Sequence, residues 1–286
     1  MPSVVIPAHN EANVIQRCLK SLLTQVRPGD LEIVVVCNGC SDDTAEIAEA
    51  FDGVRVLQTP VASKARALNM GDRAVSSFPR IYLDADVELE VGAVSAIFEA
   101  LDGKTHAVSP VPRFQLRQSS LLVRMFYRAW RNTPFYNRSM IGGSGAYALT
   151  ASGRSRFKTF PDVISDDGFV RLQFKSDERR VIDSAGSVVH CPRDMKSLLC
   201  MMTRVDAGSR QLGSLQYENL RQNEETGTGQ RIMSMVGKPW LLPCFVVYAA
   251  TRLITRRRAA RLSDGGRPAE WARDDSSRLE SGDAKV

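Results

Sequence analysis

The sequence has no hydrophobic run long enough to suggest a membrane-spanning helix. Residues 239–251 carry no charge, but these thirteen residues fall short of the roughly 20 that a helix needs to cross a bilayer. The first residues, MPSVVIPAHNEA, lack the basic start and the long apolar stretch of a secretory signal. We therefore expect a cytoplasmic protein. The residues leave open whether 232–254 span, lie on or avoid a membrane.

The six cysteines lack the spacing of a zinc ribbon. Cys37 and Cys40 form one CxxC, which could be redox-active or half of a metal site. The sequence has no second CxxC, and no thioredoxin-like pattern follows the first. Reduced thiols in a cytosolic protein are the better interpretation.

Acidic residues are missing from one long stretch. There is none between Asp102 and Asp162, although the formal net charge of the whole chain is only +6. The basic residues of this stretch are Lys104, Arg113, Arg117, Arg124, Arg128, Arg131, Arg138, Arg154, Arg156 and Lys158. A second basic cluster consists of Arg252, Arg256, Arg257, Arg258 and Arg261. This segregation predicts an anionic partner: phosphate groups, nucleic acid or an acidic membrane surface.

The first half of the chain alternates apolar strands with amphipathic helices. Strands are predicted at Ser3–Pro7, Leu31–Val36, Val54–Leu57, Ile81–Leu83 and His106–Ser109. Helices are predicted after an Asn10 cap, from about Ser41, at Ala62–Ser76 and at Val91–Leu101. Strands that are apolar throughout and alternate with helices indicate an α/β fold with a doubly wound, mostly parallel sheet covered by helices on both faces.

The second half is less regular. Helices are predicted at 119–132, 166–174 and 195–220, and strands near 180–183 and 187–190. A glycine loop, GGSG at 142–145, enters a strand. It resembles the dinucleotide fingerprint only superficially, because that fingerprint needs a strand before it and a helix after it. The tail 263–286 is polar and mixed in charge, and we predict that it is disordered.

Two carboxylates follow the strand in RIYLDADVE, at Asp84 and Asp86. Ligands of open parallel sheets bind outside the carboxyl ends of the strands, which is where this pair falls. Like charges so close repel unless a positive charge lies beside them. The pair therefore either caps a strand in water or holds a metal.

Several motifs occur in a fixed order: SVVIPAHNEANVIQRCLKSLL, EIVVVCNGCSDDTAEIA, SKARALNMG, YLDADVEL and then DVISDDGFVRLQF. In order and spacing they resemble the nucleotide-sugar domain of family 2 glycosyltransferases, which has the GT-A fold. The resemblance reaches weakly to about residue 213. It implies a nucleotide diphosphate sugar as the donor and a divalent metal, Mg²⁺ or Mn²⁺, on hard oxygen ligands.

The resemblance assigns roles residue by residue. It implies that Asp86 binds the metal and that Asp84 contacts the ribose or the metal. Further implied donor contacts are Pro7, Glu11 and Asn38 near the nucleoside and Lys64, Asn69 and Arg204 near the diphosphate. Asn38 stands where many members carry an aspartate, which weakens the case for uridine. His190 lies after an apolar strand; it is either a further metal ligand or a structural histidine.

An inverting transferase needs a base that removes the proton of the acceptor hydroxyl. The resemblance makes Asp167 this base, supported by Asp166. Paired acids at a helix start also favour the helix dipole without any catalysis. The segment around Arg204 lacks the glutamine and tryptophan of processive members, which argues against a polymer synthase.

We predict a glycosyltransferase domain at 1–222, with a nucleotide-sugar half at 1–110 and an acceptor half at 111–222. A membrane-associating segment at 223–262 precedes the tail. The arginines and aromatic residues fit an anionic membrane surface on the cytoplasmic face better than nucleic acid. The expected activity is inverting sugar transfer to a hydroxyl, with a lipid-linked acceptor as one option, in cell-envelope glycan or glycolipid synthesis. The alternatives are a retaining transferase, a sugar nucleotidyltransferase or a silent nucleotide-sugar-binding protein.

Overall fold

The computed structural model describes residues 1–133, 136, 141–214 and 238–264. Its contacts group the chain into two compact units. The first consists of Met1–Arg113, Ile141–Asp162 and Gln173–Val189, and the second of Phe114–Met140, Val163–Leu172 and His190–Val286. The boundaries predicted at 222 and 262 stay predictions, and residues 265–286 of the predicted tail lie outside the described residues.

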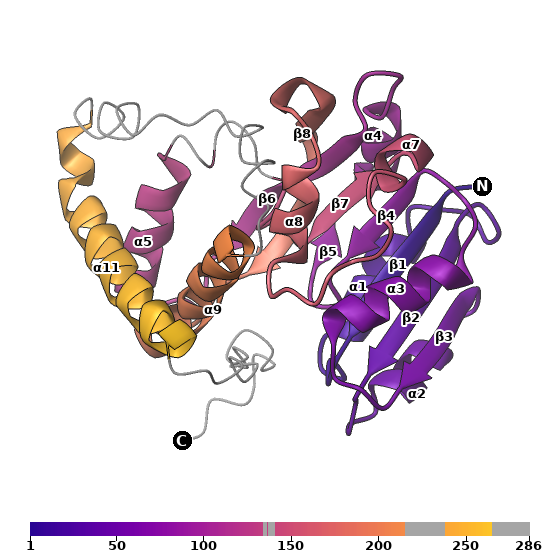
Figure 1. Cartoon of the computed structure of the whole chain (residues 1–286), viewed down its shortest axis with the longest axis horizontal. Coiled ribbons are helices and arrows are strands. Elements are labelled where there is room, and N and C mark those ends of the chain that lie inside the picture. The colour runs from indigo at the N-terminus through magenta and orange to yellow at the C-terminus, as the bar shows by residue number, and fades with distance from the viewer. Residues whose placement is uncertain (134–135, 137–140, 215–237, 265–286) are drawn as a thin grey trace. The chain divides into compact units, whose positions relative to one another are not determined.

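An eight-stranded sheet has the order β3-β2-β1-β4-β7-β6-β8-β5 (Figure 1). β1 (Ser3–Ala8), β2 (Glu32–Asn38), β3 (Val54–Thr59) and β4 (Arg80–Leu83) pair in parallel. β7 (Ala146–Leu149) pairs antiparallel with β4 and with β6 (Ala107–Gln115), and β5 (Glu88–Leu89) pairs antiparallel with β8 (Arg179–His190). The carboxyl ends of β1, β2 and β4 therefore share one edge.

Helices cover both faces of the parallel part, as predicted. Alternate side chains of β1 point to opposite faces, and Val4 and Ile6 belong to the same core cluster as Leu19 of α1 (Ile15–Leu23). Val5 points the other way, toward α3 (Lys64–Ala74). A Cβ on Gly71 of α3 would lie 2.3 Å from Val5 Cγ1, so the glycine allows this close packing. The predicted α/β fold class is confirmed.

The first unit contains four further short helices. α2 (Thr44–Glu49) and α4 (Ala93–Glu99) lie within the segments predicted as helical, whereas α7 (Ala151–Arg154) and the 3₁₀ turn η1 (Ser176–Glu178) were not predicted. The two strands predicted near 180–183 and 187–190 are one continuous strand, β8.

Asn10 does not cap the first helix, which corrects the sequence prediction. α1 begins at Ile15, and its N-cap position, Val14, makes no side-chain capping bond. Asn10 instead has a φ of 51°, and its Oδ1 accepts a hydrogen bond of 2.7 Å from the Ser41 amide. Asparagine tolerates this left-handed conformation better than most residues. Its side chain thus joins the loop after β1 to the loop after β2.

The described part of the second unit is mainly helical. It contains α5 (Leu121–Arg131), α8 (Asp166–Leu172), α9 (Met195–Ser214), the 3₁₀ turn η3 (Pro239–Leu241) and α11 (Leu242–Asp264). α11 packs on both α5 and α9, with Leu241, Cys244 and Phe245 buried against Ala129. Of the helix predicted at 195–220, α9 covers 195–214, and the rest lies outside the described residues. No helix of the described chain is both long and apolar enough to cross a membrane.

Candidate active site

The loops that follow β1 and β2 are tied together at the carboxyl edge of the sheet. Pro7 is buried in β1 opposite Val36, so it shapes the strand end through its backbone. The Glu11 amide donates to Thr44 Oγ1 at 2.7 Å, which fixes the position of Glu11, itself only 8% exposed. Sequence reasoning did not single out Thr44, although a threonine after two aspartates at a helix start was a visible signal.

Asn38 closes β2 and is buried. Its Nδ2 donates to the Ala8 carbonyl at 2.8 Å, which joins the ends of β1 and β2. Its Oδ1 is also buried and has no hydrogen-bond partner among the described residues. Buried polar atoms nearly always have a partner, so this oxygen is an acceptor available to an N–H group of a ligand.

Asp84 and Asp86 lie on a turn that leaves β4. The Val87 amide donates to the Asp84 carbonyl at 3.1 Å, and the Asp84 amide donates to the Gly145 carbonyl at 2.8 Å. Ala85 and Val87 are buried, whereas both aspartates are half-buried. Gly145 has a φ of 64°, and a Cβ there would lie 2.4 Å from Val87 Cγ2. The glycine loop thus supports the acidic turn, and it precedes a strand, as predicted.

Lys64 brings a positive charge to this turn. It is the first residue of α3, whose N-cap Ser63 accepts a hydrogen bond of 3.2 Å from the Arg66 amide. Lys64 Nζ lies 2.7 Å from Asp84 Oδ1, with 26% of the lysine side chain exposed. The structure therefore brings Lys64 and Asp84 together at the edge where both were expected.

Negative charge gathers around the buried thiol of Cys18. Burial raises the pKa of Cys18 well above its usual value, and the charges of Asp86, Asp84, Glu88 and Glu11 raise it further. Such an accumulation of carboxylates favours a bound cation. Within the described ranges no three His, Cys, Asp or Glu side chains form a group that could hold a metal by themselves. The chemistry of the Asp84 and Asp86 oxygens fits Mg²⁺, which is usually held by one or two carboxylates together with substrate phosphates.

Asn69 lies apart from these contacts. Its Nδ2 donates to the Phe160 carbonyl at 2.8 Å, and its Oδ1 accepts from the Phe160 amide at 2.8 Å. The nitrogen and the oxygen of the Asn69 side-chain amide thus attach the segment around Phe160 to α3. Its predicted contact with a diphosphate stays a prediction.

Asp166 and Asp167 begin α8 in the second unit. Asp166 is buried. Asp167 is half-buried, and its Oδ1 accepts hydrogen bonds of 2.7 Å from both Ser165 Oγ and the Gly168 amide. The segment is anchored on α9, where Gln211 Oε1 accepts from the Ile164 amide at 2.9 Å. These bonds fix the orientation of the Asp167 carboxylate.

Arg204 and His190 also belong to the second unit. Arg204 lies half-buried in α9, and His190 ends β8. Their predicted roles, a diphosphate contact for Arg204 and a metal ligand for His190, stay predictions.

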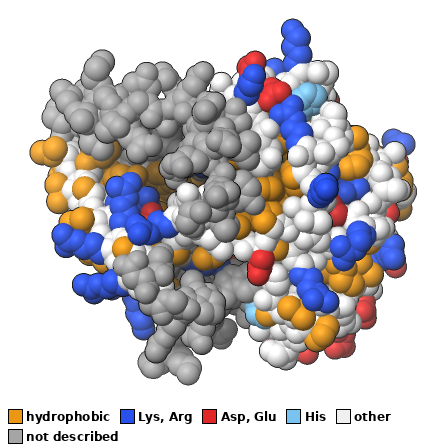
Figure 2. Space-filling view, viewed as in Figure 1, with side chains coloured by type: hydrophobic (Ala, Val, Ile, Leu, Met, Phe, Trp, Pro, Cys, Tyr) orange, Lys and Arg blue, Asp and Glu red, His pale blue; other side chains and the backbone are white. Residues whose placement is uncertain are grey.

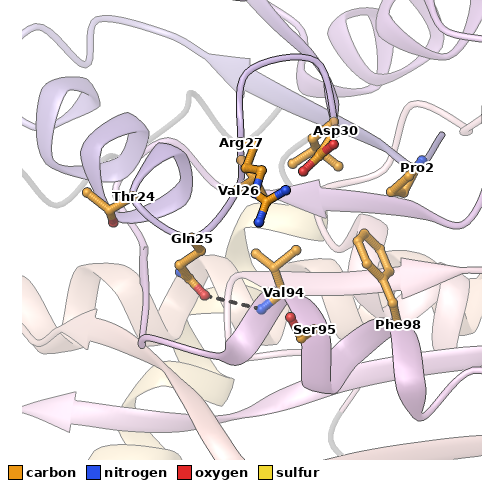
Figure 3. Close-up of a pocket in the computed structure, with 10 residues that line it drawn as sticks. Pro2, Thr24, Gln25, Val26, Arg27, Asp30, Val94, Ser95 and Phe98 are labelled. Atoms are coloured by element: carbon orange, nitrogen blue, oxygen red, sulfur yellow. Dashed lines mark hydrogen bonds between the residues drawn. The ribbon is translucent and has the colours of Figure 1, made fainter.

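A separate cavity of about 430 Å³ lies at the opposite edge of the sheet (Figure 3). Pro2 and Leu31, which precede β1 and β2, line it together with residues of α4 such as Phe98. Gln25 Oε1 accepts from the Val94 amide at 3.3 Å at its wall. None of the predicted site residues lines this cavity, so it is not a candidate for the donor site.

Comparison with known proteins identifies the chain. Residues 3–156 match the model of "Glycosyl transferase family 2". A stretch of 114 residues, 37% of this chain, is 39% identical to the chondroitin synthase of Pasteurella multocida, of which it covers 11%. The chain covers between 11% and 35% of the curated relatives it matches.

Two solved structures have a similar fold. The mannosyltransferase PcManGT of Pyrobaculum calidifontis, in complex with GDP-Man and Mn²⁺, has a TM-score of 0.60 at 18% identity, over 93% of this chain and 76% of that one. Glucosyl-3-phosphoglycerate synthase of Mycobacterium tuberculosis, in complex with Mn²⁺, UDP and phosphoglyceric acid, has a TM-score of 0.54 at 19% identity, over 74% of this chain and 78% of that one.

The fold is that of the GT-A class of glycosyltransferase structures. More particularly, the chain belongs to glycosyl transferase family 2.

Proposed function

We propose that this glycosyltransferase moves one sugar from a nucleotide diphosphate sugar to an acceptor hydroxyl, with inversion at the anomeric carbon and with a divalent metal. The acidic turn after β4 carries this proposal. It presents Asp84 and Asp86 at the carboxyl edge of the sheet, with the Lys64 ammonium 2.7 Å from Asp84. A site that combines carboxylates with a nearby positive charge suits a metal–diphosphate ligand.

Asp86 and Asp84 are the residues that would hold Mg²⁺ or Mn²⁺, with His190 as a third candidate. A divalent ion bound there would offset the charge that develops on the diphosphate as the glycosidic bond breaks. When the donor is bound, the Lys64 ammonium leaves its ion pair with Asp84 and pairs with a phosphate oxygen of the donor. Arg204 supplies a second positive charge to the diphosphate.

The nucleoside binds beside the ends of β1 and β2. Asn38 Oδ1, buried and without a partner in the described chain, accepts a hydrogen bond from an N–H group of the base. Uracil and guanine both carry such a group, so this contact does not choose between them. Pro7 and Glu11 shape the wall of the nucleoside site.

The chemical step is a direct displacement at the anomeric carbon. As the acceptor oxygen forms its bond to this carbon, the bond to the phosphate oxygen breaks, and the nucleoside diphosphate leaves with the bonding electrons. Asp167 takes the proton of the acceptor hydroxyl. Ser165 Oγ and the Gly168 amide donate to Asp167 Oδ1 at 2.7 Å and so orient the carboxylate. Asp166 supports the start of the helix. Attack from the face opposite the leaving group inverts the configuration.

The acceptor belongs, in this proposal, to cell-envelope glycan or glycolipid synthesis at a membrane surface. α11 exposes a stripe of apolar side chains, Leu242, Val246 and Leu253, and continues into the exposed Arg256 and Arg257. Figure 2 shows hydrophobic and basic side chains interspersed over the area that α11 occupies in Figure 1. A helix of this kind favours an anionic membrane surface on the cytoplasmic side over nucleic acid.

A binding titration tests the donor site. Calorimetry with UDP and GDP, each with and without Mn²⁺, compares the wild type with Asp86→Ala and with Asp52→Ala, which removes an exposed carboxylate elsewhere in the first unit. We expect Mn²⁺-dependent binding of one nucleotide that only Asp86→Ala abolishes. Binding that ignores both the metal and the Asp86 substitution would leave the aspartates as a strand cap and would refute the mechanism.

The configuration of the product separates the remaining alternatives. NMR of the transferred sugar shows its anomeric configuration. The proposed reaction gives the configuration opposite to that of the donor, whereas a retaining transferase gives the same configuration as the donor. A protein that binds the nucleotide but transfers no sugar to any of a panel of acceptors would instead fit a silent binding protein.

A further inference from the structure

The second unit contains a groove lined mainly by arginines. It has a volume of about 720 Å³ and lies along α5 and the residues that precede this helix. Four arginines line it, Arg117, Arg124, Arg128 and Arg131, together with Phe114, Gln115, Leu116 and Asn132. None of the residues assigned above to the donor, the metal or the base lines this groove.

The groove is a fixed feature of α5. Arg124, Arg128 and Arg131 follow one another at intervals of four and three residues, which places them on one side of a helix. The buried side of α5 carries Phe126, whose ring lies 5.3 Å from that of Tyr248 on α11. Packing on α11 therefore holds the arginine side toward the groove.

Two of the arginines are held in place by backbone carbonyls. Arg124 donates to the carbonyls of Ser119 and Arg117, both at 2.8 Å, and so fastens the segment that carries Arg117. Arg131 donates to the Phe114 carbonyl at 3.4 Å and lies over the Phe114 ring, 5.4 Å from its centre. These contacts order the groove, and the groups that accept these bonds are neutral carbonyls.

The other two arginines are available to a ligand. Among the described residues, the guanidinium groups of Arg117 and Arg128 make no hydrogen bond or ion pair, and no carboxylate pairs with any of the four arginines. The sequence offers no acidic residue between Asp102 and Asp162. Clustered like charges repel one another, and an anion in the groove relieves that repulsion.

We propose that this arginine groove, which none of the residues assigned to the donor site lines, binds a phosphate or diphosphate ester. The planar forks of guanidinium groups match phosphate oxygens two at a time. The volume suits a small molecule or a headgroup. The ester comes either from a soluble phosphorylated compound or from a phospholipid headgroup.

Arg117→Gln combined with Arg128→Gln is the variant that tests the groove. Neither side chain makes a contact that the fold depends on among the described residues, so the variant is expected to fold, which circular dichroism and thermal unfolding verify. The matched control is Arg27→Gln combined with Arg73→Gln, two exposed arginines of the first unit. It removes the same net charge away from the groove.

Two binding measurements distinguish the sources of phosphate. The first is calorimetry with inorganic pyrophosphate in the presence of a metal chelator, which keeps the donor site free of metal. The second is co-sedimentation with vesicles of phosphatidylglycerol, compared with phosphatidylcholine. We expect the groove variant to weaken at least one of them by about tenfold or more, since a hydrogen bond to a charged group contributes about 1.5–3 kcal/mol, and the control to leave both nearly unchanged.

Each outcome of these two measurements either supports or overturns the proposed phosphate site. Loss of pyrophosphate binding assigns the groove to a soluble phosphate ester, and loss of vesicle binding alone assigns it to a lipid headgroup. If the wild type binds neither probe, or if the control lowers binding as much as the groove variant, the proposal is wrong. Calorimetry without metal does not depend on Asp86, so failure here is distinct from failure of the proposed donor site.

Discussion

Asp167 is the residue on which the proposed chemical step depends. We predict that Asp167→Asn lowers kcat by about a hundredfold to ten-thousandfold, the usual contribution of a general base. The asparagine Oδ1 can still accept from Ser165 and Gly168, so the helix start keeps its structure, but the amide cannot take a proton. Steady-state transfer assays measure kcat, and calorimetry should give an unchanged dissociation constant for the nucleotide.

The control for this variant is Asp177→Asn, an exposed carboxylate that should retain full activity. Near-normal turnover by Asp167→Asn would move the search for the base to another carboxylate or to a histidine. A loss of nucleotide binding would point instead to a structural role for Asp167.

Glu178 shows how one ion pair couples stability to pH. Arg156 donates to its two oxygens at 2.9 and 2.6 Å, and these bonds lower the pKa of Glu178 from 4.5 to about 2. Because the pKa is lower in the folded state, the stabilisation is fully present above about pH 4.5 and is lost as the pH falls through about 2.

Arg156→Gln should therefore lower the thermal unfolding temperature at pH 6, by an amount corresponding to about 1 kcal/mol or less for a partly exposed pair. The difference from the wild type should shrink between pH 4.5 and pH 2. Part of the difference in unfolding temperature should persist, since Arg156 also packs over the Phe174 ring, 4.7 Å from its centre. A difference that stays constant down to pH 2 would contradict the ionic origin.

Sequence patterns placed several candidate residues at the carboxyl edge of the sheet but did not reveal the residues that they contact. Asp84 and Asp86 were placed at the edge because they directly follow a buried strand, a local pattern. The pairing of Asn69 with Phe160 joins residues 91 positions apart, and no local pattern reports such a contact. The ion pair of Lys64 with Asp84 depends likewise on how α3 packs on the sheet.

At the scale of elements, a buried ion pair joins α9 to α11. Asp206 Oδ1 lies 2.8 Å from Arg252 Nη2, and Asp206 Oδ2 accepts from Thr255 Oγ1 at 2.5 Å. The Asp206 side chain is only 6% exposed. Removing one partner leaves the other buried without its counter-charge, which is strongly unfavourable.

We predict that Asp206→Ala destabilises the second unit by about 3 kcal/mol. Thermal or urea unfolding measures this loss, and limited proteolysis should cut the region of α11 earlier than in the wild type. Asp194→Ala is the control, because this aspartate caps α9 near the surface through the Ser197 amide, at 2.9 Å, and should cost about 1 kcal/mol. Equal stability of Asp206→Ala and the wild type would mean that apolar packing alone holds α11.

The elements themselves were predictable where the pattern was local and strong. The apolar runs of β1, β2 and β4 fixed both their type and their place. β5, with only Glu88 and Leu89, was missed because a two-residue strand exists only through its pairing with β8. The residue type of Asn10 predicts a helix cap, whereas its bond to Ser41 depends on the neighbouring loop.

At the scale of the whole molecule, the two units suggest different partners. The first unit carries most of the candidate donor residues at one sheet edge, where acidic side chains gather, whereas Arg204 and His190 belong to the second unit. The second unit carries the arginine groove and the exposed face of α11. We propose that a nucleotide diphosphate sugar with a metal binds mainly to the first unit and that an anionic surface binds to the second. The arginines of the groove lie in the stretch without acidic residues between Asp102 and Asp162, which the amino-acid sequence displays directly.

The exposed face of α11 provides the test of membrane association. Leu242, Val246 and Leu253 are 64%, 63% and 52% exposed, and their spacing places them within about 40° of one another around the helix. Replacing all three with Gln should weaken co-sedimentation with phosphatidylglycerol vesicles about tenfold or more, since buried apolar area drives such binding. Stability should hardly change, because the buried face of α11 keeps its contacts with α5 and α9.

The matched control replaces Val61 and Val91, exposed valines of the first unit, with Gln and should bind vesicles like the wild type. The variants of α11 and of the arginine groove then report on two different forces. Loss in the α11 variant should persist at high salt, because apolar contact is not screened, whereas loss in the groove variant should be evident only at low salt. If the wild-type protein stays in the soluble fraction of lysed cells without detergent or high salt, the membrane proposal fails, whereas the donor site and the pyrophosphate test stand unaffected.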